Sequence, residues 1–315
     1  MKKVKIRYDR IIILVLIICF IIFLILGIKH IMYTHTYEYK FLNKGYDIDT
    51  IKYFETLEND KKDYILSIDY NENLINILKE KYFMWKNIDK YIAYYNENKD
   101  KTMEDVIAIV NVNANYDWYD SNIVKETDTS LNEAMLVNKF NYLPTNYNDN
   151  LDIVDIKNWY AFGERKIIKT VYEKYIEMYN DAKKEGLNLV ISSAYRTNSE
   201  QEQIYKERKD SKGLEYADSY AARPLYSEHQ TGLALDIFTP EYPTIESFEN
   251  SNEYKWLIDN SYKYGFILRY PKDKEYLTGY KYESWHFRYL GIDLAKKVYE
   301  SGLTYDEYYA YYIEK

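Results

Sequence analysis

Two short segments near the C-terminus carry the residue types of a metal site. The first, Ser-Glu-His-Gln-Thr-Gly-Leu-Ala-Leu-Asp, runs from Ser227 to Asp236 and contains His229. The second, Glu-Ser-Trp-His, runs from Glu283 to His286. Together they supply two imidazoles and a carboxylate as ligands, and a further carboxylate that could move protons. A catalytic zinc site usually has this composition, with a fourth position left for water.

The scarcity of other ligand types strengthens this interpretation. The chain has four histidines, and two of them, His30 and His35, follow an apolar N-terminal stretch. The single cysteine, Cys19, lies within that stretch, so the rest of the chain offers no disulfide and no thiolate ligand. A metal site there must use histidine and carboxylate.

The expected strands would bring the ligands together. Strands are predicted at 187–193, 232–238, 266–270 and 285–289 from alternation and branched or aromatic residues. In such strands Asp236 faces away from its apolar neighbours, and so does His286. His229 lies in the turn before the second strand. Two strands and a turn can therefore converge three ligands on one ion.

The two segments resemble those of the VanY-type zinc D-alanyl-D-alanine carboxypeptidases of bacterial cell walls, which belong to the LAS group of peptidases. A third element, Ser-Ala-Tyr-Arg at 193–196, is similar to the Ser-x-x-Arg motif of that family. The resemblance covers roughly residues 136–291. It implies that the zinc ligands are His229, Asp236 and His286 and that the catalytic base is Glu283.

Three further residues are candidates for substrate binding. The resemblance implies that Arg196 binds substrate, and a guanidinium matches a terminal carboxylate with two parallel hydrogen bonds. A surface salt bridge is the alternative for this residue. Ser227 and Gln203 could add polar contacts.

The activity implied by the resemblance is removal of the C-terminal D-alanine from peptidoglycan stem peptides. Zinc would activate a water molecule and Glu283 would accept its proton. Two alternatives stay open: an L,D-carboxypeptidase acting on tetrapeptide stems, because the motifs scarcely differ, and a non-catalytic zinc-binding module.

The N-terminal stretch predicts a membrane anchor. Residues 11–28 are apolar throughout, which reaches the lower end of the length that spans a bilayer. Five basic residues and one acidic residue precede it, so the positive-inside rule places the N-terminus in the cytoplasm and the remainder outside. A cleaved signal peptide is the alternative, but no small-x-small site follows Ile28.

The charge of the expected external part limits its partners. The whole chain carries −8. The first ten residues carry four net positive charges and Lys29 one more, so −13 remains for the rest. Such an acidic part should repel nucleic acid, and no nucleic-acid partner is expected.

The fold class predicted from this pattern is α+β, with a central antiparallel sheet and flanking helices, preceded by a transmembrane helix and a small helical region. Helices are expected at 161–185, 198–207 and 248–264, an edge strand at 135–140 and a mobile loop at 208–226. The predicted parts are a cytoplasmic basic tail at 1–10, the anchor at 11–28, a helical spacer at 29–110, a linker at 111–134 and the zinc carboxypeptidase domain at 135–315.

Overall fold

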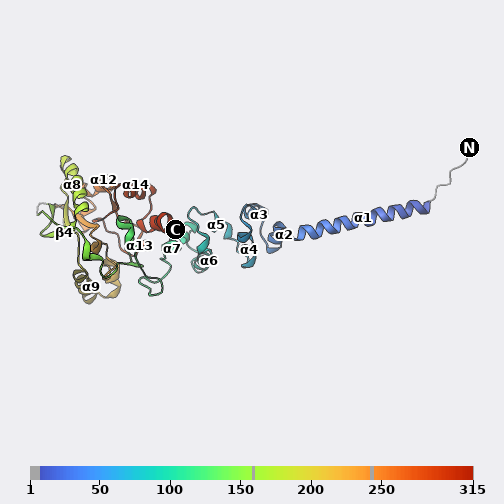
Figure 1. The fold of residues 1–315 in the computed structure, drawn as a ribbon, viewed down its shortest axis with the longest axis horizontal. Coiled ribbons are helices and arrows are strands. Elements are labelled where there is room, and N and C mark those ends of the chain that lie inside the picture. Colours follow the sequence, from blue (N-terminus) through green and yellow to red (C-terminus); the bar gives the residue numbers. More distant parts are fainter. Residues whose placement is uncertain (1–7, 158–159, 242–244, 315) are drawn as a thin grey trace, which may run out of the picture. The chain divides into compact units, whose positions relative to one another are not determined.

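The computed structural model describes residues 8–157, 160–241 and 245–314 (Figure 1). Its contacts divide the chain into two compact units, Met1–Lys79 and Glu80–Lys315. Residues 1–7 of the predicted cytoplasmic tail lie outside the described part of the chain.

This division falls earlier than the predicted linker at 111–134. The residues from Glu80 onward belong with the zinc-site domain because helix α7 (Met103–Asn111) contacts α13 (Glu275–Thr278). Ile109 of α7 and Leu277 of α13 are buried in the same small apolar cluster.

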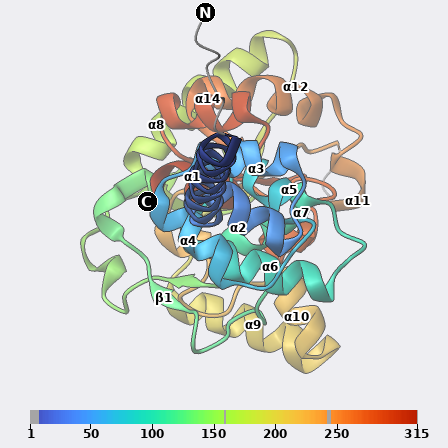
Figure 2. The same cartoon turned by 90° about the vertical axis from the view of Figure 1, so that its right-hand side faces the viewer.

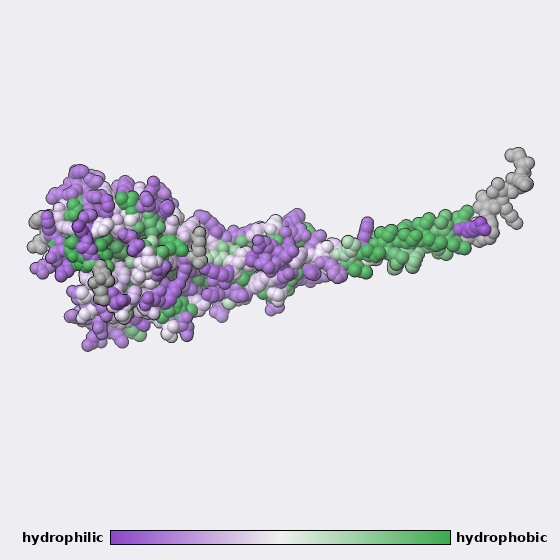
Figure 3. All heavy atoms as spheres, in the orientation of Figure 1, coloured by the Kyte–Doolittle hydropathy of each residue, from purple (hydrophilic) through white to green (hydrophobic). Residues whose placement is uncertain are grey.

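The first unit begins with a long apolar helix, α1 (Tyr8–Thr34). Its segment Arg10–Thr34 is long and apolar enough to cross a membrane, and its side chains form the continuous green surface of Figure 3. This agrees with the predicted anchor at 11–28, although a signal sequence has the same properties. Four short helices follow: α2 (Tyr37–Lys44), α3 (Ile48–Glu55), α4 (Asn59–Ser67) and α5 (Leu74–Lys79).

The second unit contains a four-stranded antiparallel sheet with the strand order β5-β6-β8-β7. Its strands are β5 (Val190–Ser193), β6 (Ala234–Phe238), β7 (Phe266–Leu268) and β8 (His286–Tyr289). These match the four predicted strands and confirm the expected mixture of helices and sheet. Two smaller pairs accompany the sheet: β1 (Lys125–Glu126) with β2 (Asn141–Tyr142), and β3 (Ile153–Ile156) with β4 (Arg165–Ile168).

One face of this sheet is buried against helices. Leu235, Ile237 and Phe287 belong to a large apolar cluster that also includes residues of α8 (Lys169–Lys184) and α12 (Asn252–Asn260). Figures 1 and 2 both show α8 and α12 with α14 (Ile292–Ser301) on one side of this unit. The alternate residues of the same strands face the other way, as predicted for Asp236 and His286.

On the other side of the unit lie α9 (Asn198–Lys212) and α10 (Leu214–Tyr220), which contact each other (Figures 1 and 2). Thr197 caps α9 through a capping box with Glu200. The remaining helical segments are η1 (Trp85–Asn87), α6 (Ile88–Glu97), η2 (Thr129–Ala134), η3 (Tyr147–Asn150), η5 (Glu228–Thr231), α11 (Ile245–Phe248), η6 (Ser261–Tyr264), α15 (Tyr305–Tyr308) and the π-helix η7 (Tyr309–Ile313).

Three local predictions were wrong. The segment 135–140 is irregular rather than a strand, although Met135 and Val137 are buried. The helix expected at 161–185 begins only at Lys169, because the preceding residues pair with β3. The expected loop at 208–226 is mostly helical, with the end of α9 followed by α10. Apolar residues alone could not indicate α10, since Ala217 is the only residue of that helix that is fully buried.

Candidate active site

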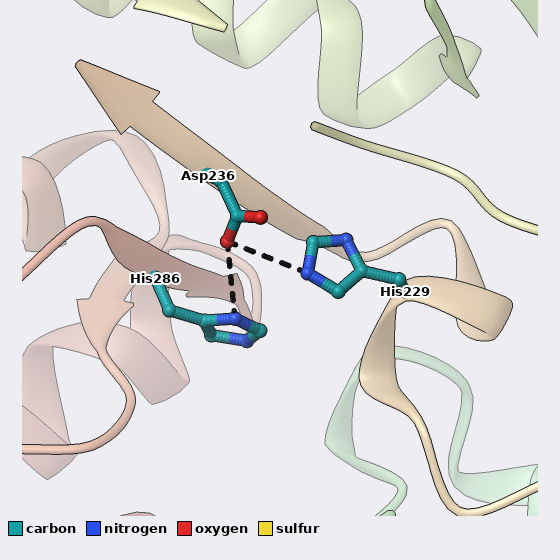
Figure 4. Close-up of side chains that lie close together, drawn as sticks. All are labelled: His229, Asp236 and His286. Carbon is teal, nitrogen blue, oxygen red and sulfur yellow. Dashed lines mark ion pairs between the residues drawn. The ribbon is translucent and has the colours of Figure 1, made fainter. Parts of the chain in front are cut away.

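The three predicted metal ligands meet at one point of the sheet (Figure 4). His229 comes from η5, Asp236 from β6 and His286 from β8. Asp236 and His286 are directly opposite each other in the β6–β8 register. The Oδ1 atom of Asp236 lies 3.4 Å from His229 Nε2 and 3.3 Å from His286 Nδ1.

This spacing fits a tetrahedral zinc ion. Ligand atoms at the usual zinc distances are separated from one another by about 3.3–3.4 Å. Asp236 Oδ1 is buried and accepts no hydrogen bond from the described residues, as expected of an atom that binds a cation. All three side chains are buried, and imidazole with carboxylate is a ligand set that zinc accepts.

Hydrogen bonds on the far side of each imidazole fix which nitrogen faces the ion. His229 Nδ1 lies 2.7 Å from the Ala194 carbonyl oxygen, which leaves Nε2 for the metal. His286 Nε2 lies 3.2 Å from Glu228 Oε2, which leaves Nδ1. Such outer partners orient a ligating histidine and make it a stronger base.

The sequence interpretation overlooked Glu228. Arg269 Nε and Arg288 Nη1 each donate to its Oε1 over 2.8 Å, and all three side chains are fully buried. Burial alone would raise the pKa of Glu228, but the charges of these arginines hold it well below its ordinary value. Arg269 and Arg288 could have indicated a buried carboxylate, because they occur in otherwise apolar strands and a buried cation needs an anion as its partner.

Glu283 lies beside the metal ligands. Its Oε2 is 3.5 Å from His286 Nδ1, and its backbone N–H donates to the Tyr270 carbonyl over 3.1 Å. Burial raises the pKa of Glu283 to about 7, against the opposing effect of His286, and the charge of Asp236 adds to the rise. A carboxyl group with such a pKa can both accept and release a proton near neutral pH.

Arg196 contacts Asp236 at Oδ2, the carboxylate oxygen that does not face the two histidines. Its Nη2 donates to Asp236 Oδ2 over 3.3 Å, and its Nη1 donates to Gln201 Oε1 over 3.2 Å. Nε and Nη2 both donate to Ser193 Oγ. The guanidinium is therefore held in place by three side chains.

The site opens into a cleft of about 990 Å³ whose walls include the metal ligands, Glu283, Arg196 and Ser227. Gln203 does not line this cleft. It is exposed on α9, bonds Glu207 and lines a second cavity of about 1030 Å³. Gln201, two residues earlier and buried, lines the cleft instead, because residues two apart project from different sides of a helix.

A buried histidine–aspartate–histidine triad with a carboxylate at its side, on an antiparallel sheet, has the composition of a catalytic zinc site in a hydrolase. The model of the VanY family, described as D-alanyl-D-alanine carboxypeptidase, matches residues 164–292 of this chain. The Bacillus subtilis (strain 168) protein YodJ is 42% identical over 185 residues, which are 56% of this chain and 67% of that protein. The chain therefore belongs to the VanY family and is a zinc carboxypeptidase, as the motifs predicted.

The solved structures that are similar to this chain include two peptidases. The LdcB LD-carboxypeptidase shares 38% identity and a TM-score of 0.54, over 60% of this chain and 90% of that one. A VanY D,D-pentapeptidase from a VanB-type resistance cassette, in complex with Zn(II), shares 32% identity and a TM-score of 0.49, over 56% of this chain and 98% of that one.

Proposed function

We propose that this protein removes the C-terminal D-alanine from peptidoglycan stem peptides at the outer side of the cell membrane. One observation carries the proposal: Glu283 and Arg196 lie in the same cleft as the metal triad, each in contact with a metal ligand. The VanY family model adds support for a D-alanyl-D-alanine substrate.

His229, Asp236 and His286 would hold the zinc ion. Zinc in such a site acts as a Lewis acid and lowers the pKa of a bound water. Glu283 would accept the proton of the attacking water and deliver it to the departing amine, a role that suits its raised pKa.

Arg196 would bind the carboxylate of the leaving D-alanine, and Ser227 lines the same cleft. We assign the remaining amide contact to Gln201 rather than Gln203, since only Gln201 lines the cleft and touches Arg196. Because Arg196 also holds Asp236, its removal should affect both substrate binding and the metal ligand.

The helix α1 would anchor the protein in the membrane as a single span, with the basic N-terminus in the cytoplasm. A protease-protection experiment on intact cells tests this orientation. Digestion of the zinc-site domain from outside supports it, and full protection contradicts it.

A second candidate is an L,D-carboxypeptidase that removes D-alanine from tetrapeptide stems. It is favoured by the structural similarity to the LdcB LD-carboxypeptidase. The cleft residues named above suit either substrate, since both end in a D-alanine carboxylate.

The full chain, purified in detergent and loaded with zinc, should be incubated with stem pentapeptide and separately with tetrapeptide, with and without a chelator. Mass spectrometry identifies the products. Loss of one D-alanine from the pentapeptide, abolished by the chelator, supports the first candidate. Cleavage of the tetrapeptide alone supports the second, and no metal-dependent cleavage of either contradicts both.

Glu283→Gln tests the assigned base. We expect it to bind zinc normally and to lose turnover by a factor of about 10²–10⁴. Full turnover with bound zinc would refute this assignment. Arg196→Ala should lower kcat/KM, and unchanged kinetics would remove its role in substrate binding.

A further inference from the structure

The cleft contains a second cationic region away from Arg196. Three further basic residues line the cleft, Arg208, Lys212 and Lys281, and are here called the cationic subsite; one acid away from the metal ligands, Glu275, lines the cleft too. Arg208 and Lys212 are one turn apart on α9, and Lys281 lies between α13 and β8 on another wall. This positive region stands out in a protein whose part beyond the N-terminal helix carries −13.

Arg208 is held in position but is not neutralised. Its Nη1 donates to the Tyr220 carbonyl oxygen over 2.8 Å, which fixes the side chain between α9 and α10. Within the described ranges, no carboxylate lies within salt-bridge distance of it. Its remaining N–H groups are therefore available to a ligand in the cleft.

Arg196 and Arg208 differ in this respect. Four of the five N–H groups of Arg196 serve Ser193, Gln201 and Asp236, which leaves one on Nη1 for the terminal carboxylate. Arg208 faces the same cleft, and its charge reaches both Arg196 and Glu283. A substrate passing the metal site therefore meets a second guanidinium with an unused fork, which is the geometry that a carboxylate requires.

Lys281 connects the walls of the cleft. Its backbone N–H donates to the Ser219 carbonyl of α10 over 3.2 Å, while its side chain is exposed and lines the cleft. Lys212 packs over the ring of Tyr216 at 4.6 Å. Both residues line the same cleft as Arg208.

We propose that Arg208, assisted by Lys212 and Lys281, binds a carboxylate of the peptide substrate in the cleft of the metal site. This proposal rests on the proposed function, because it assigns the site a peptide that carries free carboxylates. Because Arg196 is assigned the C-terminal carboxylate, the group assigned to Arg208 is an acidic group within the stem, upstream of the scissile bond.

The test compares wild type and Arg208→Met on peptides that differ in one group. One pair carries either a free acid or an amide at the internal acidic residue. If Arg208 binds that group, wild type has a KM about tenfold lower for the acid, and the variant loses this preference with little change in kcat.

The second arm uses D-alanyl-D-alanine and its C-terminal amide as competing ligands. Wild type should prefer the acid because Arg196 binds the terminal carboxylate, and Arg208→Met should keep this preference. The proposal is overturned if the variant keeps the wild-type preference for the internal acid, if it loses the preference for the terminal acid instead, or if it weakens acids and amides by the same factor.

Lys206→Met is the matched control, because Lys206 lies on the same helix, is exposed and lines neither cavity. It should retain wild-type preferences. Should Arg208→Met fail to fold, Lys281→Gln tests the same preference from another wall, with a smaller loss expected. If wild type cleaves no peptide, the proposed function fails, and calorimetric binding of the same peptide pairs to the zinc-loaded chain still decides the role of Arg208.

Discussion

Glu228→Gln is the most informative perturbation of the site, because one carboxylate serves both the fold and a metal ligand. It accepts from Arg269 and Arg288 over 2.8 Å each and lies 3.2 Å from His286 Nε2. Glutamine keeps the shape and one acceptor oxygen but removes the charge. The NH2 group of the glutamine would then face an N–H donor of a neighbouring side chain, at a place where the carboxylate oxygen had accepted a hydrogen bond.

The expected loss follows from what each partner retains. Removing one partner of a buried ion pair costs about 3–5 kcal/mol. Arg269 keeps its bonds to Asp306, and Arg288 keeps those to the carbonyl oxygens of Glu133 and Met135. We therefore expect the lower end, about 3 kcal/mol, or a fall in Tm of roughly 6–12 °C. Zinc affinity should fall about 10–100-fold, since His286 loses the partner that orients it.

Two measurements check this prediction. Thermal or urea unfolding of the metal-free chain gives the stability, and competition with a chromogenic chelator gives the zinc affinity. Glu300→Gln is the control, because its pair with Lys296 is 59% exposed on both sides and should contribute at most about 1 kcal/mol. If Glu228→Gln matched Glu300→Gln in both measurements, the proposed role of the buried carboxylate would be wrong.

Two further predictions concern the framework of the cleft. Gly232→Ala should destabilise the protein by about 1–3 kcal/mol, because Gly232 has φ +72° and an added Cβ would lie 2.7 Å from Ile168 Cγ1. Gly302→Ala is the control, because Gly302 has φ +69° but an added Cβ there would meet no other atom, so this variant shows the cost of the backbone conformation alone. Equal losses of unfolding free energy for the two variants in urea would refute the steric argument. Burial lowers the pKa of Lys139 from 10.5 to about 8, so above pH 8 the unfolded chain keeps a proton that the folded chain has lost. The free energy of unfolding should therefore rise relative to Lys139→Met by up to roughly 3 kcal/mol between pH 8 and 10.5, whereas a constant difference would contradict the assignment.

The metal triad could be predicted from the sequence because each ligand lies in a short motif of rare residue types. Strand alternation also predicted that Asp236 and His286 would face away from the core. Their register could not be predicted, since nothing local to either strand specifies which residue opposes which. In the structure they are direct partners across β6 and β8, and this pairing brings Asp236 Oδ1 and His286 Nδ1 to 3.3 Å from each other.

The supporting residues were harder to predict because their roles depend on partners distant in sequence. Glu228 resembles a solvated acid until Arg269 and Arg288, some 41 and 60 residues away, are seen to surround it. The sequence interpretation named Gln203 and did not consider Gln201, because the motif does not specify which side of α9 faces the metal. That choice depends on the N-terminal cap at Thr197 and on the contact of Gln201 with the Ala222 carbonyl.

Charge balance explains why so many ionised groups can be buried beside one metal ion. Two arginines, Arg269 and Arg288, face two carboxylates, Glu228 and Asp306, so this network is close to neutral. Its four members come from η5, the end of β7, β8 and α15, and the network therefore joins the segments that carry His229 and His286. Substituting a charged member should disturb both ligand positions together, whereas substituting Arg208 should leave the triad intact and alter only what the cleft binds. The two sets of variants thus separate assembly of the metal site from recognition of its substrate.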